Sequence, residues 1–286
     1  MTSTGSGDPA MPIVDSQVHI WGANTPARPW PHRVTPHRPV PFSAEDALRE
    51  MRAAGVQRAI LVPPWWEGER NDLALAAAQA HPEKFAVMGL FDAEAEGARD
   101  TLATWRMQRG MLGFRFSSQD PKYRGALADG RMDWVWREAE SADLPVMLSV
   151  NPEELNVVDR IAVCHPALRI AIDHLARRFR ASDEAAFPNM EGLVALARRS
   201  NVAVKASGMP AYTTDIYPYR RVHDHLRRTY DAFGPRRMFW GSDLTKLPCS
   251  YRQAVTMFTE ELPWLGGDDL HWVMGRALCD WLGWKD

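Results

Sequence analysis

The chain has 286 residues, 45% of them hydrophobic, so it is long enough to bury a large core as one large α/β domain or as two smaller ones. It carries 34 Lys and Arg residues against 36 Asp and Glu residues, and this balance gives no electrostatic reason to expect nucleic acid or an anionic membrane as a partner. These values favour a small-molecule substrate.

The start of the chain lacks the basic and apolar regions of a secretory signal, and no run of about 18 apolar residues suggests a membrane span. We expect residues 1–10 to form a disordered lead and residues 11–286 to form a single domain. Cys164, Cys249 and Cys279 are widely spaced and form no CxxC pair, which favours a reducing cytoplasm. The sequence leaves a monomer and a homo-oligomer open.

Eight β-rich runs alternate with helical patterns after residue 11. The predicted strands cover residues 12–21, 58–64, 85–91, 110–117, 145–150, 169–176, 201–208 and 237–243. The predicted helices cover residues 43–55, 71–82, 95–110, 132–142, 151–166, 190–200, 219–234 and 251–262. This order predicts a (β/α)8 TIM barrel, closed by an extra C-terminal helix over residues 269–284. An open doubly wound sheet is disfavoured because the turn after Trp21 is long and proline-rich rather than glycine-rich.

The first predicted strand, VDSQVHIW, carries polar residues at alternate positions. Strand periodicity predicts that Asp15, Gln17 and His19 share one face. Buried polar groups without partners are costly, so three together indicate a polar network, a metal site or a catalytic pocket.

Polar residues also lie at the ends of other predicted strands. His174 ends the sixth strand, Asp243 ends the eighth, and Arg115 lies on the fourth. TIM barrels place their active sites at the carboxyl ends of the strands. A single buried histidine is more often structural than catalytic, but His19, His174 and Asp243 together favour a site.

Several segments in this order, namely IVDSQVHIW, GMLGFRFS, IAIDHLA, VAVKASG and RMFWGSD, resemble the amidohydrolase superfamily. The resemblance is to its second amidohydrolase-related family, which includes lactonases acting on pyrone dicarboxylate, sugar acid lactones and sulfomuconolactone. In that family the site is formed by a strand-one D-x-H-x-H, a strand-six His and a strand-eight Asp. The matching residues are Asp15, Gln17, His19, His174 and Asp243.

Gln17 departs from the family pattern because it stands where the first histidine belongs. An amide oxygen is a poorer zinc ligand than imidazole, so a two-metal centre is not expected. We expect that no cofactor is required: His19, His174 and Gln17 would donate hydrogen bonds to a carbonyl oxygen while Asp243 takes a proton from water, as the resemblance to metal-independent lactonases implies. The alternative is one divalent ion, such as Zn²⁺ or Mn²⁺, held by His19, His174 and Asp243.

Arg115 alternates with Phe114 and Phe116, so it is predicted to point into the barrel. A buried guanidinium needs an anion, and either a substrate carboxylate or an internal ion pair with Asp15 or Asp173 would serve. Because His174 is required inside, we expect its neighbour Asp173 to face the helices, which favours the substrate.

Further substrate contacts are predicted from strand ends and loops. Lys205 and Ser207 share one face of the seventh strand, Trp65 follows the second strand, and His32 lies in the long loop after the first.

These observations predict a hydrolase that opens a lactone or similar cyclic ester of a small, acidic metabolite. The sequence contains no GxSxG elbow that would support covalent catalysis. The alternatives are a metal-dependent decarboxylase or hydratase of an aromatic acid, and a degenerate barrel that binds a small metabolite without turnover.

Overall fold

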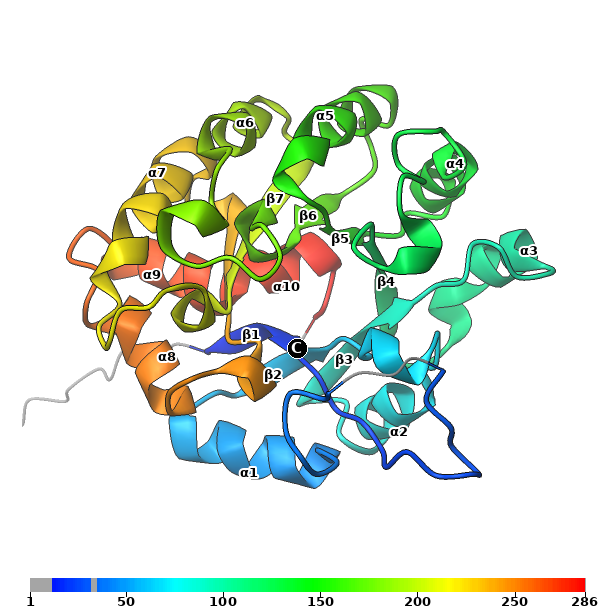
Figure 1. Cartoon of the computed structure of the whole chain (residues 1–286), viewed down its shortest axis with the longest axis horizontal. Coiled ribbons are helices and arrows are strands. Elements are labelled where there is room, and N and C mark those ends of the chain that lie inside the picture. Colours follow the sequence, from blue (N-terminus) through cyan, green and yellow to red (C-terminus); the bar gives the residue numbers. More distant parts are fainter. Residues whose placement is uncertain (1–11, 32–34, 286) are drawn as a thin grey trace, which may run out of the picture.

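The computed structural model describes residues 12–31 and 35–285 of the chain. Eight parallel strands form one sheet in the order β1 to β8, which curls into a nearly closed barrel (Figure 1). The predicted TIM-barrel fold is confirmed. The disordered lead expected over residues 1–10 lies outside the described residues. The strands are β1 (Val14–Val18), β2 (Arg58–Leu61), β3 (Phe85–Leu90), β4 (Met111–Ser117), β5 (Val146–Ser149), β6 (Ile170–Ile172), β7 (Val202–Ser207) and β8 (Met238–Gly241).

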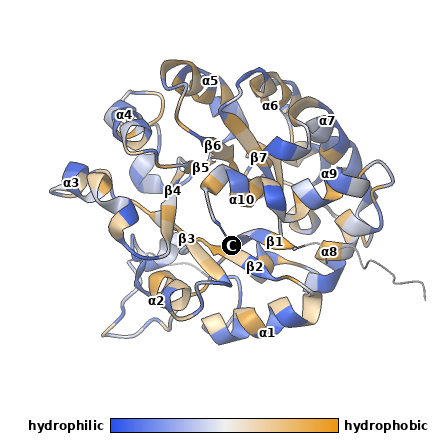
Figure 2. Ribbon diagram, turned by 180° about the vertical axis from the view of Figure 1, so that it is seen from behind, coloured by the Kyte–Doolittle hydropathy of each residue, from blue (hydrophilic) through white to orange (hydrophobic). Residues whose placement is uncertain are grey.

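Helices surround the strands, and Figure 2 shows hydrophobic residues concentrated on several strands while the helices carry both kinds. Ser43 begins α1 with a capping box formed with Asp46, and Gly55 ends it in the left-handed conformation that glycine favours. The helices are α1 (Ala44–Ala54), α2 (Asp72–Ala80), α3 (Ala98–Ala103), α4 (Asp133–Ser141), α5 (Leu155–Cys164), α6 (Met190–Ala195), α7 (His223–Phe233), α8 (Tyr251–Thr259), α9 (Gly267–His271) and α10 (Ala277–Leu282). None of these described helices is long and apolar enough to cross a bilayer.

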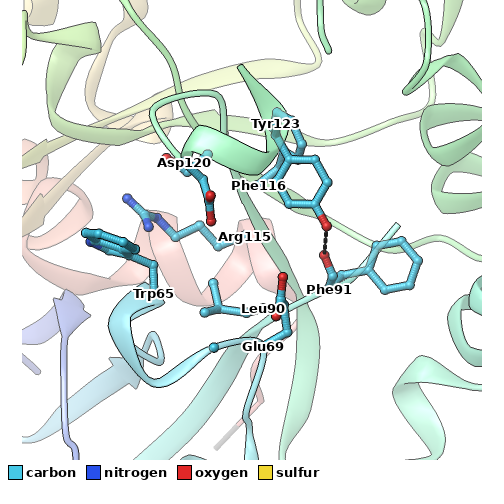
Figure 3. A pocket seen from close by; sticks show the side chains of 10 residues that line it. Trp65, Glu69, Leu90, Phe91, Arg115, Phe116, Asp120 and Tyr123 are labelled. Atoms are coloured by element: carbon cyan, nitrogen blue, oxygen red, sulfur yellow. Dashed lines mark hydrogen bonds between the residues drawn. The ribbon is translucent and has the colours of Figure 1, made fainter. Parts of the chain in front are cut away.

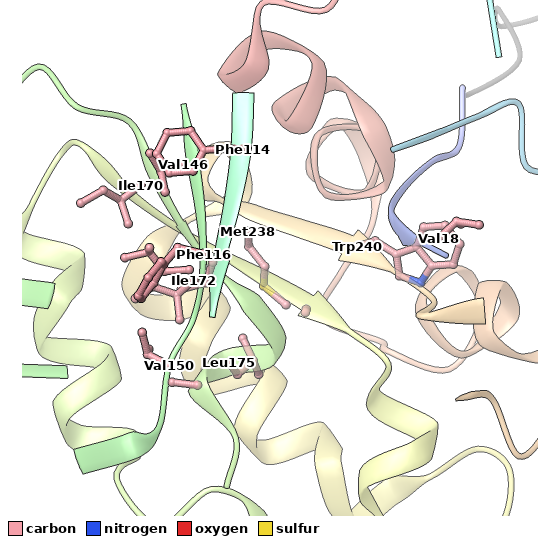
Figure 4. Close-up of a cluster of buried hydrophobic side chains, with 14 of the residues drawn as sticks. Val18, Phe114, Phe116, Val146, Val150, Ile170, Ile172, Leu175, Met238 and Trp240 are labelled. Carbon is pink, nitrogen blue, oxygen red and sulfur yellow. The ribbon is translucent and has the colours of Figure 1, made fainter. Parts of the chain in front are cut away.

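The apolar core has two parts. One lies between the strands and the surrounding helices, where Phe114 and Phe116 of β4 pack outwards as predicted (Figure 4). The other fills the barrel interior at the end covered by α10, where Val14, Met147 and Phe239 pack with Leu278 of that helix. The C-terminal helix therefore closes one end of the barrel, as the sequence predicts, and leaves the other end for a site.

Asp15 does not share a face with Gln17 and His19, so that prediction is wrong. The pairing of β1 with β2 shifts register between Asp15 and Val18, and this irregularity interrupts the alternation of side chains. Val14 instead faces the interior, and Asp15 turns towards α8.

The Asp15 carboxylate joins β8 to β1 where the barrel closes. It accepts hydrogen bonds from the backbone N–H of Ser242 at 2.9 Å, from the Ser242 hydroxyl, and from the Tyr251 hydroxyl at 2.6 Å. The strands are so close here that a side chain at Gly241 would clash with the Ser16 hydroxyl. Asp15 is therefore a structural residue that holds the β8 end beside β1.

Candidate active site

Three residues from the predicted site meet at the open end of the barrel. His19 follows β1, His174 follows β6 and Asp243 follows β8, and at most 5% of each is exposed. His174 and Asp243 both have left-handed backbones, with φ of 54° and 50°. Such conformations are unfavourable for residues other than glycine and occur often at functional sites. The sharp turns aim both side chains across the barrel.

The Asp243 carboxylate lies at the centre of this cluster. Its Oδ1 lies 3.3 Å from His19 Nε2, and its Oδ2 lies 4.0 Å from His174 Nε2. Oδ2 accepts a hydrogen bond from the Lys246 ammonium at 2.9 Å. Oδ1 is buried without a hydrogen-bond partner among the described residues. A buried carboxylate oxygen in this state needs a donor from outside the protein.

The protons of the two imidazoles are assigned from their neighbours. Nδ1 of His19 lies 2.6 Å from the Val62 carbonyl oxygen, and Nδ1 of His174 lies 3.2 Å from the Ser207 carbonyl oxygen. A carbonyl oxygen only accepts, so each Nδ1 is assigned a proton, and Nε2 of His19 accepts from the Gln17 amide nitrogen, 3.2 Å away. Burial lowers the pKa of His174 well below its usual range, which keeps that ring neutral.

Asp243 is ionised in this setting. Burial acts to raise its pKa, but the pKa lies well below the usual range because the Lys246 ammonium lies beside the carboxylate. The cluster thus offers two free acceptors, Asp243 Oδ1 and His174 Nε2, because His19 Nε2 already accepts from the Gln17 amide. This corrects the expected donor role of His19 and His174, because neither Nε2 carries a proton in this arrangement.

Arg115 points into the barrel as predicted, and its Nε donates to Asp173 Oδ2 at 2.7 Å. Asp173 also forms an ion pair with Lys205, at 2.9 Å between Oδ1 and Nζ. The expectation that Asp173 faces the helices is therefore wrong: β6 ends at Ile172, and the chain turns so that Asp173 and His174 both point inwards. Burial acts to raise the pKa of Asp173, but Lys205 and Arg115 hold it well below its usual range.

Lys205 and Ser207 do not reach the pocket surface where the sequence places them. Both are fully buried, and Ser207 Oγ lies 2.9 Å from His174 Nδ1. Lys205 donates to the Gln17 amide oxygen, and the Gln17 amide nitrogen lies 3.2 Å from His19 Nε2. Both residues therefore contact other members of the site.

A pocket opens at Arg115, and Trp65, Glu69, Asp120 and Tyr123 also line it (Figure 3). The ion pair of Arg115 uses Nε, and no described residue accepts a hydrogen bond from its two terminal nitrogens. These nitrogens are available to a ligand in the pocket. His32 lies outside the described residues.

Lys246 is a neighbour of the site that the sequence analysis does not name, and His37, in the same long loop as His32, is another neighbour. Lys246 follows Asp243 by three residues in SDLTK, a spacing that brings its ammonium back to the carboxylate. His37 lies over His19, with ring centroids 5.6 Å apart, and burial lowers its pKa to about 3. The position of Lys246 at the end of the eighth strand was the available signal.

The alternative of a single divalent ion requires His19, His174 and Asp243 to act together as its ligands. Within residues 12–31 and 35–285, no group of three or more His, Cys, Asp and Glu side chains is arranged to hold a metal ion. The lone pair of His19 faces the Gln17 amide N–H, and Asp243 Oδ2 already binds the Lys246 ammonium. His19, His174 and Asp243 do not fit an ion in this arrangement.

Comparison with known proteins identifies the family. The family model described as Amidohydrolase matches residues 14–276. An L-fucono-1,5-lactonase from Burkholderia ambifaria is 27% identical over 244 residues, which cover 80% of this chain and 79% of that protein.

Solved structures share the fold. An amidohydrolase from Burkholderia multivorans with bound zinc has a TM-score of 0.79 and 21% identity, covering 95% of this chain and 99% of that one. A putative 2-pyrone-4,6-dicarboxylic acid hydrolase from Pseudomonas putida has a TM-score of 0.77 and 22% identity, covering 96% and 99%.

The ion network predicts a large stability effect at Asp173. In Asp173→Asn, Arg115 and Lys205 would be left as buried cations without their anion, so we expect the free energy of unfolding to fall by about 3–5 kcal/mol at pH 7 in urea titrations. Because the folded pKa of Asp173 is depressed, its stabilisation is present above the unfolded value of about 3.9 and is lost as pH falls below it. Wild type and variant should therefore converge in acid.

The control for this variant is Asp159→Asn, which removes a carboxylate paired with the surface residues Arg198 and Arg199. Its loss should stay below about 1 kcal/mol. A similar small loss for Asp173→Asn would show that the interior pairs contribute little.

Proposed function

The chain belongs to the amidohydrolase family and is a hydrolase of that type, and we propose that it opens a lactone or similar cyclic ester of a small, acidic metabolite. The observation that carries this proposal is the buried Asp243 Oδ1, which lacks a donor among the described residues and lies beside the lone pair of His19. Water supplies the donor that this group of acceptors needs, and a carboxylate that accepts its proton turns it into a nucleophile.

In the proposed reaction, Asp243 takes a proton from water while the water oxygen attacks the lactone carbonyl. His174 Nε2 accepts the second hydrogen bond of the water and orients it, because His19 Nε2 already accepts from the Gln17 amide. The Lys246 ammonium, 2.9 Å from Asp243 Oδ2, supplies positive charge beside the developing oxyanion. The bond between the carbonyl carbon and the ring oxygen then breaks, and the proton held by Asp243 passes to that oxygen.

The terminal nitrogens of Arg115 support an acidic substrate. The Nε of Arg115 is paired with Asp173, so the two terminal nitrogens can offer two parallel hydrogen bonds to a substrate carboxylate. The pocket lined by Arg115 and Trp65 is the proposed place for this group.

The similar proteins support the reaction class. One is named a lactonase, and another is named a hydrolase of a pyrone, which is itself a cyclic ester. A fuconolactone is neutral and a pyrone dicarboxylate is acidic, so the two compounds differ in the negative charge that Arg115 is proposed to bind.

Asp243→Asn is the primary test of the reaction. The amide keeps the shape of the carboxylate but cannot take a proton from water, so we expect kcat on the best lactone substrate to fall about 10²- to 10⁴-fold. Ring opening is followed by acid release, and an unchanged melting temperature would show that the fold is retained. Activity within a few-fold of wild type would exclude Asp243 as the base.

The same panel of compounds separates the alternative functions. Release of CO₂ from aromatic acids would identify a decarboxylase. Tight binding without turnover of any lactone would identify a binding protein.

Arg115→Lys tests the charge of the substrate. Lysine keeps a positive charge near Asp173 but cannot make two parallel hydrogen bonds, so KM for an acidic lactone should rise roughly 10- to 100-fold, from the loss of about 1.5–3 kcal/mol. The kinetics of a neutral lactone with the same ring should change little. Equal losses on both lactones, with a lower melting temperature, would make Arg115 a purely structural residue.

Chelation tests the proposal that no cofactor is required. Because Gln17 and Lys246 already donate to two of the candidate ligands, most activity should survive exhaustive dialysis against a chelator. Gln17→His restores an imidazole beside His19 and should raise the affinity for Zn²⁺, measured by calorimetry. Complete loss of wild-type activity on chelation, with recovery on adding Zn²⁺ or Mn²⁺, would establish the single-ion alternative.

A further inference from the structure

Lys205 is a charged residue that the proposed reaction does not use directly. It lies on β7 with none of its surface exposed, and its ammonium contacts only protein atoms among the described residues. These are Asp173 Oδ1 at 2.9 Å, Met147 Sδ at 3.3 Å and the Gln17 amide oxygen. Burying a lysine this deeply is costly, and burial lowers its pKa. Asp173 offsets part of the cost and holds the ammonium at the barrel axis.

The contact with Lys205 determines which way the Gln17 amide points. An ammonium has three donors and no acceptor, so the amide must present its oxygen to Lys205. The amide nitrogen then faces His19 Nε2, 3.2 Å away. A flipped amide would place its NH₂ group against the ammonium and its oxygen against a lone pair.

The amide orientation in turn defines what His19 offers to Asp243. Because Nδ1 of His19 donates to Val62 and Nε2 accepts from Gln17, the ring is held at both nitrogens. Its Nε2 lies 3.3 Å from Asp243 Oδ1, but the lone pair of this nitrogen accepts from Gln17 and the nitrogen has no proton to donate. Asp243 Oδ1 receives no proton from the ring and stays available to water.

We propose that Lys205 is a positioning residue for the hydrolytic centre, acting through Gln17 to keep His19 an acceptor beside Asp243. The inference rests on the proposed function, because it assigns a role within that same site. It also gives a reason for the glutamine at position 17. An amide accepts from an ammonium on one side and donates to an imidazole on the other, which neither a carboxylate nor an apolar side chain does.

Gln17→Glu separates this role from a structural one. The carboxylate keeps the shape of glutamine and its contact with Lys205, but it has no N–H for His19. We expect kcat to fall about 10- to 100-fold with KM within threefold and no loss of melting temperature, in buffer containing a chelator so that the added carboxylate recruits no ion. A kcat within twofold of wild type would overturn the proposal.

A double-variant cycle tests whether Lys205 acts through Gln17. Lys205→Met removes the ammonium and retains the length of the side chain, and Gln17→Leu removes the amide. If the two act in series, the double variant should be no slower than the slower single variant. The control pairs Lys205→Met with Tyr230→Phe, whose hydroxyl bonds Asp269 on the outer helices, and its effects should simply multiply. Multiplying effects for Lys205 and Gln17 would show that they act independently.

A spectroscopic measurement tests the proposal without turnover. The ¹⁵N resonance of His19 Nε2 reports whether that nitrogen accepts a hydrogen bond, so it should change in both Gln17→Glu and Lys205→Met. The resonance of His165, which pairs with Glu140 away from the site, should stay constant. An unchanged His19 resonance would overturn the positioning role even if the lactonase activity were established. A changed resonance in a protein that opens no lactone would place the failure in the proposed reaction instead.

Discussion

The end of the barrel that carries the candidate site is organised by the buried ion pairs of Asp173 with Arg115 and Lys205. All three side chains are nine-tenths buried or more, so each charge would be costly without the others. Below them the interior is apolar and is closed by α10, and above them lie the imidazoles and Asp243. The network therefore lies between the apolar interior and the polar site. It also holds Arg115, which faces the pocket, and Lys205, which contacts Gln17.

The ends of β6 and β8 turn abruptly, and this geometry is what brings the site together. Three consecutive residues from His174 to Ala176 have positive φ values, and Asp243 has one as well. Such backbone costs on the order of 1–3 kcal/mol per residue and persists only when surrounding contacts stabilise it. Here the contacts are the hydrogen bonds of His174 with Ser207 and the ion pair of Asp243 with Lys246. The strain is held at the residues proposed to act on water.

The alternation of β-rich runs with helical patterns was sufficient to predict the eight βα units and the closing helix, because every strand carries an apolar run. Strand periodicity predicted the wrong face for Asp15, because nothing in the sequence of β1 indicates its register shift. It also failed at Asp173, where a turn with positive φ follows Ile172 and adjacent residues both point inwards. The sequence placed Lys205 on the correct face of its strand. It could not predict the contact of its ammonium with Gln17, because that contact joins two strands far apart in the sequence.

The glutamine at position 17 bears on whether this barrel is an active enzyme or a degenerate one. In a site released from function, nothing would require the amide to match its neighbours on both sides. Here its oxygen meets the Lys205 ammonium and its nitrogen meets the His19 lone pair, while Asp243 Oδ1 stays free of protein donors among the described residues. A histidine binding an ion would use its lone pair for the metal, whereas this amide uses its N–H to keep the neighbouring imidazole an acceptor. The substitution therefore fits a centre organised around a water molecule and interior cations, and it argues against the loss of function that the departure from the family pattern first suggests.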